Sequence, residues 1–310
     1  MEAPERFDPQ AMHGRLIEAE HLARYWWAAA LVPGKRVLDA GCGTAYGSEI
    51  LARSGASEVV GVDLDQAVVE AARASTGTVS LEVADVRHLP YPDASFDAAV
   101  CFEVIEHVDD PETILDELRR VLRPDGLLIV SSPNRDVYPP GNPHHRHEFT
   151  PDELAEALSA RFEQVRLVRQ HDWLGSGVVE DADFAAGGEG SFSAVVRKAV
   201  RGAPGEELYT LALASAAELP QAEPLVLLTE TADAKWWQEQ LEQIRGERDT
   251  IERTLAEQVA RLAERDAQLR KAEAEKVELH EVIRSMQATR VWKLGTSYWN
   301  LRDRLLRRLG

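Results

Sequence analysis

Two patterns of apolar residues alternate along the chain between about residues 35 and 133. One is a set of short runs rich in Val, Leu and Ile, which are typical of buried strands: VLDA, VVGVDL, VSLEVAD, AAVCFEV and LLIVSSP. The other is a set of segments with apolar residues at helical spacing: GSEILARS, DQAVVEAARAS and DPETILDELRRVL. This alternation predicts βαβ units, and therefore a parallel sheet with helices on both faces.

Further elements extend this core at both ends. Residues 16–31, LIEAEHLARYWWAAAL, predict an amphipathic helix before the first strand. After the fifth strand, a loop rich in Pro and His leads to a helix that we expect to begin at Thr150, its N-cap. The segments QVRLVRQ and ELYTLALAS predict two more strands, separated by a Gly- and Asp-rich insertion at residues 172–200. We therefore expect residues 1–230 to form an α/β domain with a doubly wound, seven-stranded, mostly parallel sheet.

From Ala234 the pattern becomes that of a long helix with a heptad repeat. Ten of fourteen seam positions are apolar, and the fourteen are Leu241, Ile244, Arg248, Ile251, Leu255, Gln258, Leu262, Arg265, Leu269, Ala272, Lys276, Leu279, Ile283 and Met286. Such a seam predicts a coiled coil over residues 234–289, formed as a homodimer or with another partner helix. The alternative is a single charged helix that folds back on the domain.

The last residues, 290–310, differ in charge from the rest of the chain. They carry six Arg and Lys residues against Asp303 alone, interleaved with Trp292, Trp299 and several Leu residues. A basic amphipathic tail of this kind is expected to lie on an anionic membrane surface. Docking to a partner protein and a disordered tail are the alternatives.

Composition narrows the class of protein. The 310 residues carry a formal net charge of −18, which argues against nucleic acid as a partner. Two cysteines are too few for a disulfide framework, the N-terminus has no apolar signal segment, and no apolar run is long enough to span a membrane. These features predict a cytoplasmic protein, whose contact with the inner membrane face would be made by the tail.

The stretch KRVLDAGCGTAYG, residues 35–47, runs from the first strand into a glycine-rich turn. Such a turn before a helix lets a ligand approach the backbone. The acid at Asp39 is unfavourable for a pyrophosphate but suits a cationic amine, Asp63 ends the second strand where a ribose diol binds, and Asp85 follows the third strand where an adenine amino group would lie. An amine, a ribose and an adenine without phosphate favour S-adenosylmethionine (SAM) over NAD, the remaining rival.

The motifs VLDAGCGTAYG, VVGVDLD, ADVRHLPYPDASFDAAVCFEVIEHVDDP and LRRVLRPDGLLIVSSPN together resemble class I SAM-dependent methyltransferases, over residues 35–134. More weakly, EHLARYWWAAAL and HEFTPDEL are similar to bacterial members associated with polysaccharides and the cell envelope. The resemblance implies a Rossmann-like fold and a SAM site. The cofactor-binding residues it implies are Arg24, Tyr25, Asp39, Gly41, Gly43, Tyr46, Asp63, Leu64, Asp85, Val86 and Glu103.

One position departs from the family pattern. Ala45 stands where a glycine is usual, after Thr44. We expect Gly47 to take over some of the conformational freedom that a glycine at Ala45 would supply, since a positive φ at alanine is strained.

The acceptor side is marked by histidines. Removal of a proton from an acceptor hydroxyl needs a base, and His107 and His147 are the candidate catalytic residues because both follow strands at the edge where ligands bind. Helix capping or packing is the alternative for His107, and a sugar-hydroxyl contact or a structural loop for His147. The run HHRH places its side chains too close together for a typical zinc site, so no metal is expected.

The leading expectation is an O-methyltransferase acting on a sugar of a surface polysaccharide, glycolipid or related glycan. A methyltransferase for a natural product or quinone is the alternative within enzymes. A SAM-binding scaffold that organises a glycan-assembly complex is the alternative from another class.

Overall fold

The computed structural model describes residues 12–13, 15–173, 178, 196, 202–228 and 234–309. The chain divides into two compact units, Met1–Ala232 and Asp233–Gly310. Most of the insertion predicted at residues 172–200 lies outside the described residues.

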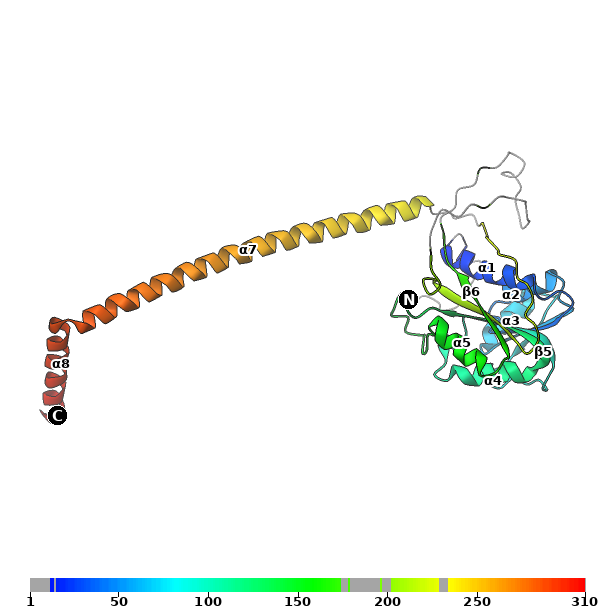
Figure 1. Cartoon of the computed structure of the whole chain (residues 1–310), viewed down its shortest axis with the longest axis horizontal. Coiled ribbons are helices and arrows are strands. Elements are labelled where there is room, and N and C mark those ends of the chain that lie inside the picture. The colour runs from blue at the N-terminus through cyan, green and yellow to red at the C-terminus, as the bar shows by residue number, and fades with distance from the viewer. Residues whose placement is uncertain are drawn as a thin grey trace. The chain divides into compact units, whose positions relative to one another are not determined.

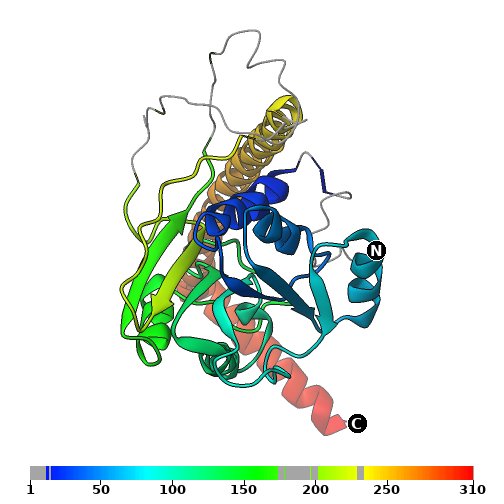
Figure 2. The same ribbon diagram turned by 90° about the vertical axis from the view of Figure 1, so that its right-hand side faces the viewer.

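The first unit is built on one seven-stranded sheet (Figures 1 and 2). Its strands are β1 (Arg36–Ala40), β2 (Glu58–Asp63), β3 (Ser80–Val83), β4 (Phe96–Phe102), β5 (Leu122–Pro133), β6 (Gln164–Gln170) and β7 (Tyr209–Ser215). The strand order is β3-β2-β1-β4-β5-β7-β6, and β7 alone runs antiparallel to its two neighbours. The predicted seven-stranded, mostly parallel sheet of a Rossmann-like methyltransferase is therefore confirmed.

Helices cover both faces of this sheet, and they are α1 (Leu16–Ala29), α2 (Tyr46–Arg53), α3 (Gln66–Ser75), α4 (Pro111–Val121) and α5 (Pro151–Ser159), with a short 3-10 turn, η1 (Ile105–His107). On one face α1 and α2 pack on the sheet through buried residues such as Ala28 and Leu51. On the other face α4 and α5 do so through residues such as Leu118 and Leu154. Helix α5 begins as predicted, because Thr150 and Glu153 form a reciprocal capping box.

One element differs from the sequence-based expectation. The predicted helix DPETILDELRRVL runs to Leu122 and the predicted strand LLIVSSP begins at Leu127, but β5 begins at Leu122, directly where α4 ends. Leu122 pairs with Phe96, and the register then shifts so that Ala98 pairs with Leu127. The buried side chain of Leu122 thus extends the sheet into a segment whose polar residues concealed a strand.

The second unit consists of two helices, α7 (Ala234–Ala288) and α8 (Arg290–Leu309). They are separated at Thr289, whose hydroxyl donates to the Met286 carbonyl at 2.7 Å and accepts from the Trp292 amide at 3.3 Å. Thr289 therefore ends one helix and caps the next. Among the described residues, no helix has both the length and the apolar character needed to span a bilayer.

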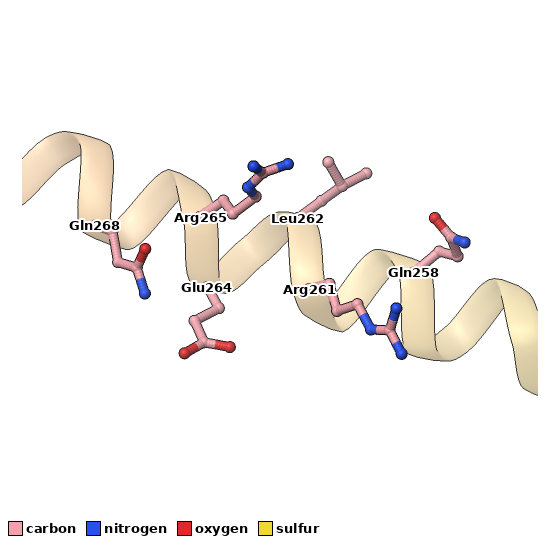
Figure 3. A pocket seen from close by; sticks show the side chains of 6 residues that line it. All are labelled: Gln258, Arg261, Leu262, Glu264, Arg265 and Gln268. Atoms are coloured by element: carbon pink, nitrogen blue, oxygen red, sulfur yellow. The ribbon is translucent and has the colours of Figure 1, made fainter.

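The heptad seam of α7 is exposed from Ile244 to Met286 within this unit. Figure 3 shows three seam residues, Gln258, Leu262 and Arg265, on one side of the helix, with the remaining labelled side chains on the other. The side chain of Leu262 is 61% exposed, and those of its seam neighbours Leu255 and Leu269 are each 62% exposed. The hollow between the side chains in Figure 3 is formed by one helix alone, so we do not assign it as a ligand site. The coiled coil stays a prediction.

Candidate active site

The glycine-rich turn joins β1 to α2 and is held in a left-handed backbone. Gly41 and Gly43 have φ of +83° and +52°. A Cβ on Gly41 would lie 2.3 Å from a methyl carbon of Val104, so this position excludes any side chain. Ala45 itself adopts φ +66°, and Gly47 lies in α2 without a positive φ. The prediction that Gly47 takes over the backbone freedom is therefore wrong.

Gly47 has a different function, which is to leave room for Tyr25. A Cβ at Gly47 would lie 2.2 Å from the Tyr25 ring. The strain at Ala45 is about 1–2 kcal/mol for a left-handed alanine. Its methyl group is buried beside Val69 and Leu81, which returns about 0.8 kcal/mol. Burial therefore offsets part of the strain, which helps to accommodate alanine where glycine is usual.

Asp39, at the end of β1, is fully buried and accepts two hydrogen bonds. The Tyr25 hydroxyl donates to one carboxylate oxygen at 2.9 Å, and the Ser48 hydroxyl donates to the other at 2.5 Å. Burial raises the pKa of Asp39 to about 6, although both hydrogen bonds act to lower it. The carboxylate is therefore held in place by α1 and α2 and is ready to attract a cationic group at neutral pH.

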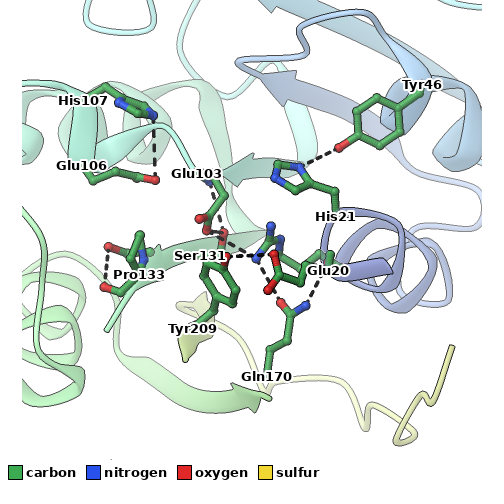
Figure 4. Close-up of polar contacts among 12 residues, drawn as sticks. Glu20, His21, Tyr46, Glu103, Glu106, His107, Ser131, Pro133, Gln170 and Tyr209 are labelled. Carbon is green, nitrogen blue, oxygen red and sulfur yellow. Dashed lines mark hydrogen bonds and ion pairs between the residues drawn. The ribbon is translucent and has the colours of Figure 1, made fainter. Parts of the chain in front are cut away.

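Arg24 lies one residue before Tyr25 on α1 and is also buried. Its Nη1 donates to Gln170 at 3.1 Å and lies 3.6 Å from the Glu103 carboxylate, and its guanidinium stacks on Tyr209. Its Nε and Nη2 have no hydrogen-bond partner among the described residues. These three partners come from the end of β4, from β6 and from β7, and Figure 4 shows Glu103, Gln170 and Tyr209 close to one another. These two buried donors of Arg24 are therefore suited to hydrogen-bond a carboxylate, such as that of a methionine.

Glu103 follows β4 in an uncommon backbone conformation, with φ +54°. The Glu103 carboxylate accepts a hydrogen bond from the Ser131 hydroxyl at 2.7 Å, and the Glu103 backbone amide donates to that Ser131 hydroxyl oxygen at 3.2 Å. Tyr46 extends the group of polar residues, because its hydroxyl lies 3.0 Å from Nδ1 of His21 on α1. These contacts bring together Arg24, Tyr25, Asp39, Tyr46 and Glu103, five of the predicted cofactor residues.

The predicted nucleoside-binding residues lie at the ends of β2 and β3. Asp63 accepts from the backbone amides of Gly43 at 2.9 Å and Asp65 at 3.0 Å, so it fixes the glycine turn. Leu64 is 66% exposed, as expected of a surface that an adenine ring would cover. Asp85 forms a two-pronged ion pair with Arg87, which lowers the pKa of Asp85, and Val86 is half-buried beside it. Asp85 would share its oxygens with Arg87 when it accepts an adenine amino group.

The two candidate bases, His107 and His147, pack against different residues in the structure. His107 lies in η1, and its ring packs edge-on against that of His145 at a centroid distance of 5.1 Å. His147 packs instead on Phe149, at 4.5 Å. Glu106, next to His107, is fully buried, and burial together with the nearby Glu103 raises the pKa of Glu106 well above its usual range. The assignment of His107 and His147 as bases stays a prediction.

Several residues of this site were missed by reasoning from the sequence. Ser131, Gln170 and Tyr209 come from β5, β6 and β7, and only the strand order brings Ser131 to Glu103 and the other two to Arg24. Glu106 had a local signal, since an acid beside His107 in a stretch that is apolar at its other three positions, VIEHV, is unusual.

Comparisons with known proteins agree with this geometry. The family described as "Methyltransferase domain" matches residues 38–130. A probable S-adenosylmethionine-dependent methyltransferase of Mycolicibacterium smegmatis is 39% identical over 193 residues, which cover 60% of this chain and 73% of the relative. One of Mycobacterium tuberculosis is 37% identical over 190 residues, 59% of this chain and 68% of the relative. A ubiquinone biosynthesis O-methyltransferase of Xanthomonas campestris is 36% identical over 156 residues, 43% of this chain and 64% of the relative.

The sheet order, the glycine turn with its buried acid, and these relatives define the class. The chain belongs to the SAM-dependent methyltransferases. It is an enzyme of the transferase class, and its cofactor is SAM. The residues present fit that cofactor, because Asp39 offers a buried carboxylate to the amine and Arg24 offers two unpaired donors to the carboxylate.

Proposed function

We propose that this methyltransferase methylates a hydroxyl group on a sugar of a surface polysaccharide, glycolipid or related glycan. The observation that supports a sugar is the polar character of the edge beyond Glu103, where Glu106, His107 and His145 meet. An acceptor with many hydroxyl groups can use such hydrogen-bonding residues, whereas a quinone ring would need an apolar pocket. The likeness of EHLARYWWAAAL and HEFTPDEL to envelope-associated members supports the same choice.

The proposed division of labour follows from the geometry. When bound, SAM supplies an electrophilic methyl group on a sulfonium. Asp39 and Arg24 bind the two charged ends of its methionine part, and Asp63 and Leu64 hold the nucleoside. The protein then needs to orient the acceptor hydroxyl and to take up its proton, for which His107 and His147 are the candidates.

Two alternatives carry their own support. The relative named as a ubiquinone biosynthesis O-methyltransferase favours a phenolic or quinone acceptor. The exposed seam of α7 favours a scaffold that organises a glycan-assembly complex.

One turnover experiment separates these proposals. The full chain is incubated with SAM and, in turn, nucleotide sugars, glycolipids and small phenols, and a mass increase of one methyl group is the readout. Methylation of a sugar supports the leading proposal, and methylation of phenols alone overturns it in favour of the alternative. Asp63→Ala is expected to abolish turnover. If His107→Asn and His147→Asn both keep full turnover, neither histidine is the base.

We also propose that the seam of α7 pairs with a second copy of the chain. Its leucines at Leu255, Leu262, Leu269 and Leu279 are each about 60% exposed in one chain, and pairing would remove them from water. Light scattering should show a dimer for the full chain and a monomer for the Leu255→Glu/Leu262→Glu variant. The matched control, Glu257→Gln/Glu264→Gln, changes residues outside the seam and should remain a dimer.

The proposed partner of α8 is an anionic membrane surface. Leu294, Tyr298 and Leu301 lie one helical turn apart and are exposed, and Arg302 stacks on Trp299 at 3.8 Å. Pelleting with phosphatidylglycerol vesicles should fall when residues 288–310 are deleted, and should stay low with neutral phosphatidylcholine vesicles. Equal pelleting of the deleted and full chains would remove this proposal.

A further inference from the structure

Three potential metal ligands meet where η1 follows β4. The carboxylate of Glu106 and the rings of His107 and His145 offer one ligand atom each, and these atoms lie within 4.8 Å of one another. Two residues come from the turn after β4 and the third from the loop after β5. Two imidazole nitrogens and one carboxylate oxygen form a ligand set that suits zinc, iron and similar divalent ions.

Glu106 carries the argument for a ligand. Its side chain is fully buried, and both carboxylate oxygens lack a hydrogen-bond partner among the described residues. Its contact with Nε2 of His107 is 4.0 Å long, which is beyond hydrogen-bonding distance (Figure 4). A buried carboxylate without donors is costly, and the neighbouring Glu103 adds repulsion. A bound cation would supply both the missing charge and the missing coordination.

Both histidines are oriented as metal ligands usually are. Nδ1 of His107 lies 3.3 Å from the His144 carbonyl, and Nδ1 of His145 lies 2.6 Å from a carboxylate oxygen of Glu148. A carbonyl or a carboxylate can only accept, so in each ring Nδ1 is the donor and Nε2 is the nitrogen that remains to bind an ion. A second partner that fixes the tautomer in this way is a regular feature of ligating histidines.

The backbone holds the three groups together. The carbonyl of Glu106 accepts from the amides of Arg146 at 2.7 Å and His147 at 3.1 Å, which ties the histidine loop to η1. The loop is closed again where Asn134 bridges to Phe149. The ligand atoms are therefore positioned by fixed backbone rather than by a free loop.

We infer that Glu106, His107 and His145 bind a divalent first-row transition-metal ion at the acceptor edge of the site. This departs from the expectation that no metal is bound. That expectation considered the HHRH run alone, and it missed that the fold pairs one member of the run with Glu106 and His107.

The consequence for catalysis rests on the proposed function. A hydroxyl oxygen that coordinates a divalent cation loses its proton more readily. Sugar hydroxyls bound at this ion would be oriented and made more acidic, with the proton released to water. His107 would then act as a ligand instead of as the base, and water would replace a protein base as the proton acceptor.

The test is metal binding by the full chain, measured without SAM or acceptor. Chelator-treated protein is titrated with Zn²⁺, Mn²⁺ and Mg²⁺ by calorimetry, and Co²⁺ absorption reports the ligand set. The wild type should bind one Zn²⁺, at least about tenfold more tightly than Mg²⁺. Glu106→Gln and His145→Gln should each weaken Zn²⁺ binding by at least about 30-fold, since even the partners of ligands are worth 10–100-fold. His144→Gln is the matched control, with a change of less than about twofold.

Two results would overturn the inference. One is Zn²⁺ binding that Glu106→Gln and His145→Gln leave unchanged, which would indicate an adventitious surface ion. The other is no binding to the folded wild type. Thermal unfolding in chelator shows whether each variant is folded, and either variant alone suffices if the other fails to fold. A protein that binds Zn²⁺ but methylates no sugar would leave this inference standing and overturn the proposed function instead.

Discussion

Asp39 and Glu106 are both buried carboxylates at the carboxyl edge of the sheet, yet their surroundings are opposite. Asp39 accepts hydrogen bonds from the Tyr25 and Ser48 hydroxyls, each on a different helix. Glu106 has no hydrogen-bond donor to its carboxylate among the described residues. A carboxylate that is already paired needs only one further cationic group, such as an amine. A carboxylate without donors needs an ion that supplies its whole coordination, and this difference separates the cofactor site from the inferred metal site.

The largest expected effect is the loss of SAM affinity when Asp39, the hydrogen-bonded carboxylate, is replaced. Asp39→Asn should weaken SAM binding about 100-fold or more, because it removes a buried charge from the amine. Calorimetry with SAM measures the change. Asp116→Asn, on the exposed face of α4, is the control and should change the affinity less than about twofold. A loss of less than about threefold in Asp39→Asn would show that the amine binds elsewhere.

The second effect tests how Asp39 is held. Gly47→Ala would drive a methyl group into the Tyr25 ring and should lower the free energy of unfolding by about 1–3 kcal/mol. It should also weaken SAM binding, because Tyr25 can no longer donate to Asp39. Gly77→Ala meets no atom within 4 Å and serves as the matched control in urea denaturation. Equal stability of the two variants would mean that Tyr25 does not depend on this space.

A third effect is the pH dependence of SAM binding. Burial places the pKa of Asp39 at about 6, so the carboxyl is protonated below that pH and loses its attraction for an amine. Affinity should therefore rise about tenfold between pH 5 and pH 7 and then level off. Burial also raises the pKa of Glu20 to about 8, which places its titration above this range. Asp39→Asn should show a flat profile, and a rise of similar size in that variant would assign the titration to another group.

The smallest expected effect is the change in the free energy of unfolding when either carboxylate is replaced in the absence of metal. In chelator at pH 7, Glu106→Gln should change the free energy of unfolding by less than about 1 kcal/mol, because the Glu106 carboxyl group makes no hydrogen bond within the described residues that the substitution would remove. Asp39→Asn should lower it by about 1 kcal/mol, because the Tyr25 and Ser48 hydroxyls lose a charged acceptor. Urea unfolding compares the two variants, and a destabilisation of several kcal/mol in Glu106→Gln would show that its carboxylate is stabilised within the protein.

Much of the fold could be predicted from the sequence because its signals are local. Apolar periodicity located all seven strands, and the Thr150 cap located the start of α5. The start of β5 at Leu122 was missed because polar residues follow it, and only pairing with Phe96 makes it a strand.

More of the cofactor site than of the acceptor site could be predicted from the sequence. Asp39 and Asp63 stand at strand ends that the pattern itself marks, whereas the partners of Arg24 are more than 70 residues away in sequence, at Glu103 and Gln170. The meeting of His145 with Glu106 likewise depends on backbone hydrogen bonds between distant segments. The conformation of Ala45 was misjudged because its strain is offset by burial that the sequence does not show.

The most direct test of the comparison is a pair of calorimetric titrations, SAM and Zn²⁺, on wild type, Asp39→Asn and Glu106→Gln. We expect Asp39→Asn to lose SAM binding and keep Zn²⁺ binding, and Glu106→Gln to lose Zn²⁺ binding and keep SAM binding. If Glu106→Gln weakens SAM as much as Asp39→Asn does, or if it leaves Zn²⁺ binding intact, then the two carboxylates do not serve two different ligands and the account is contradicted.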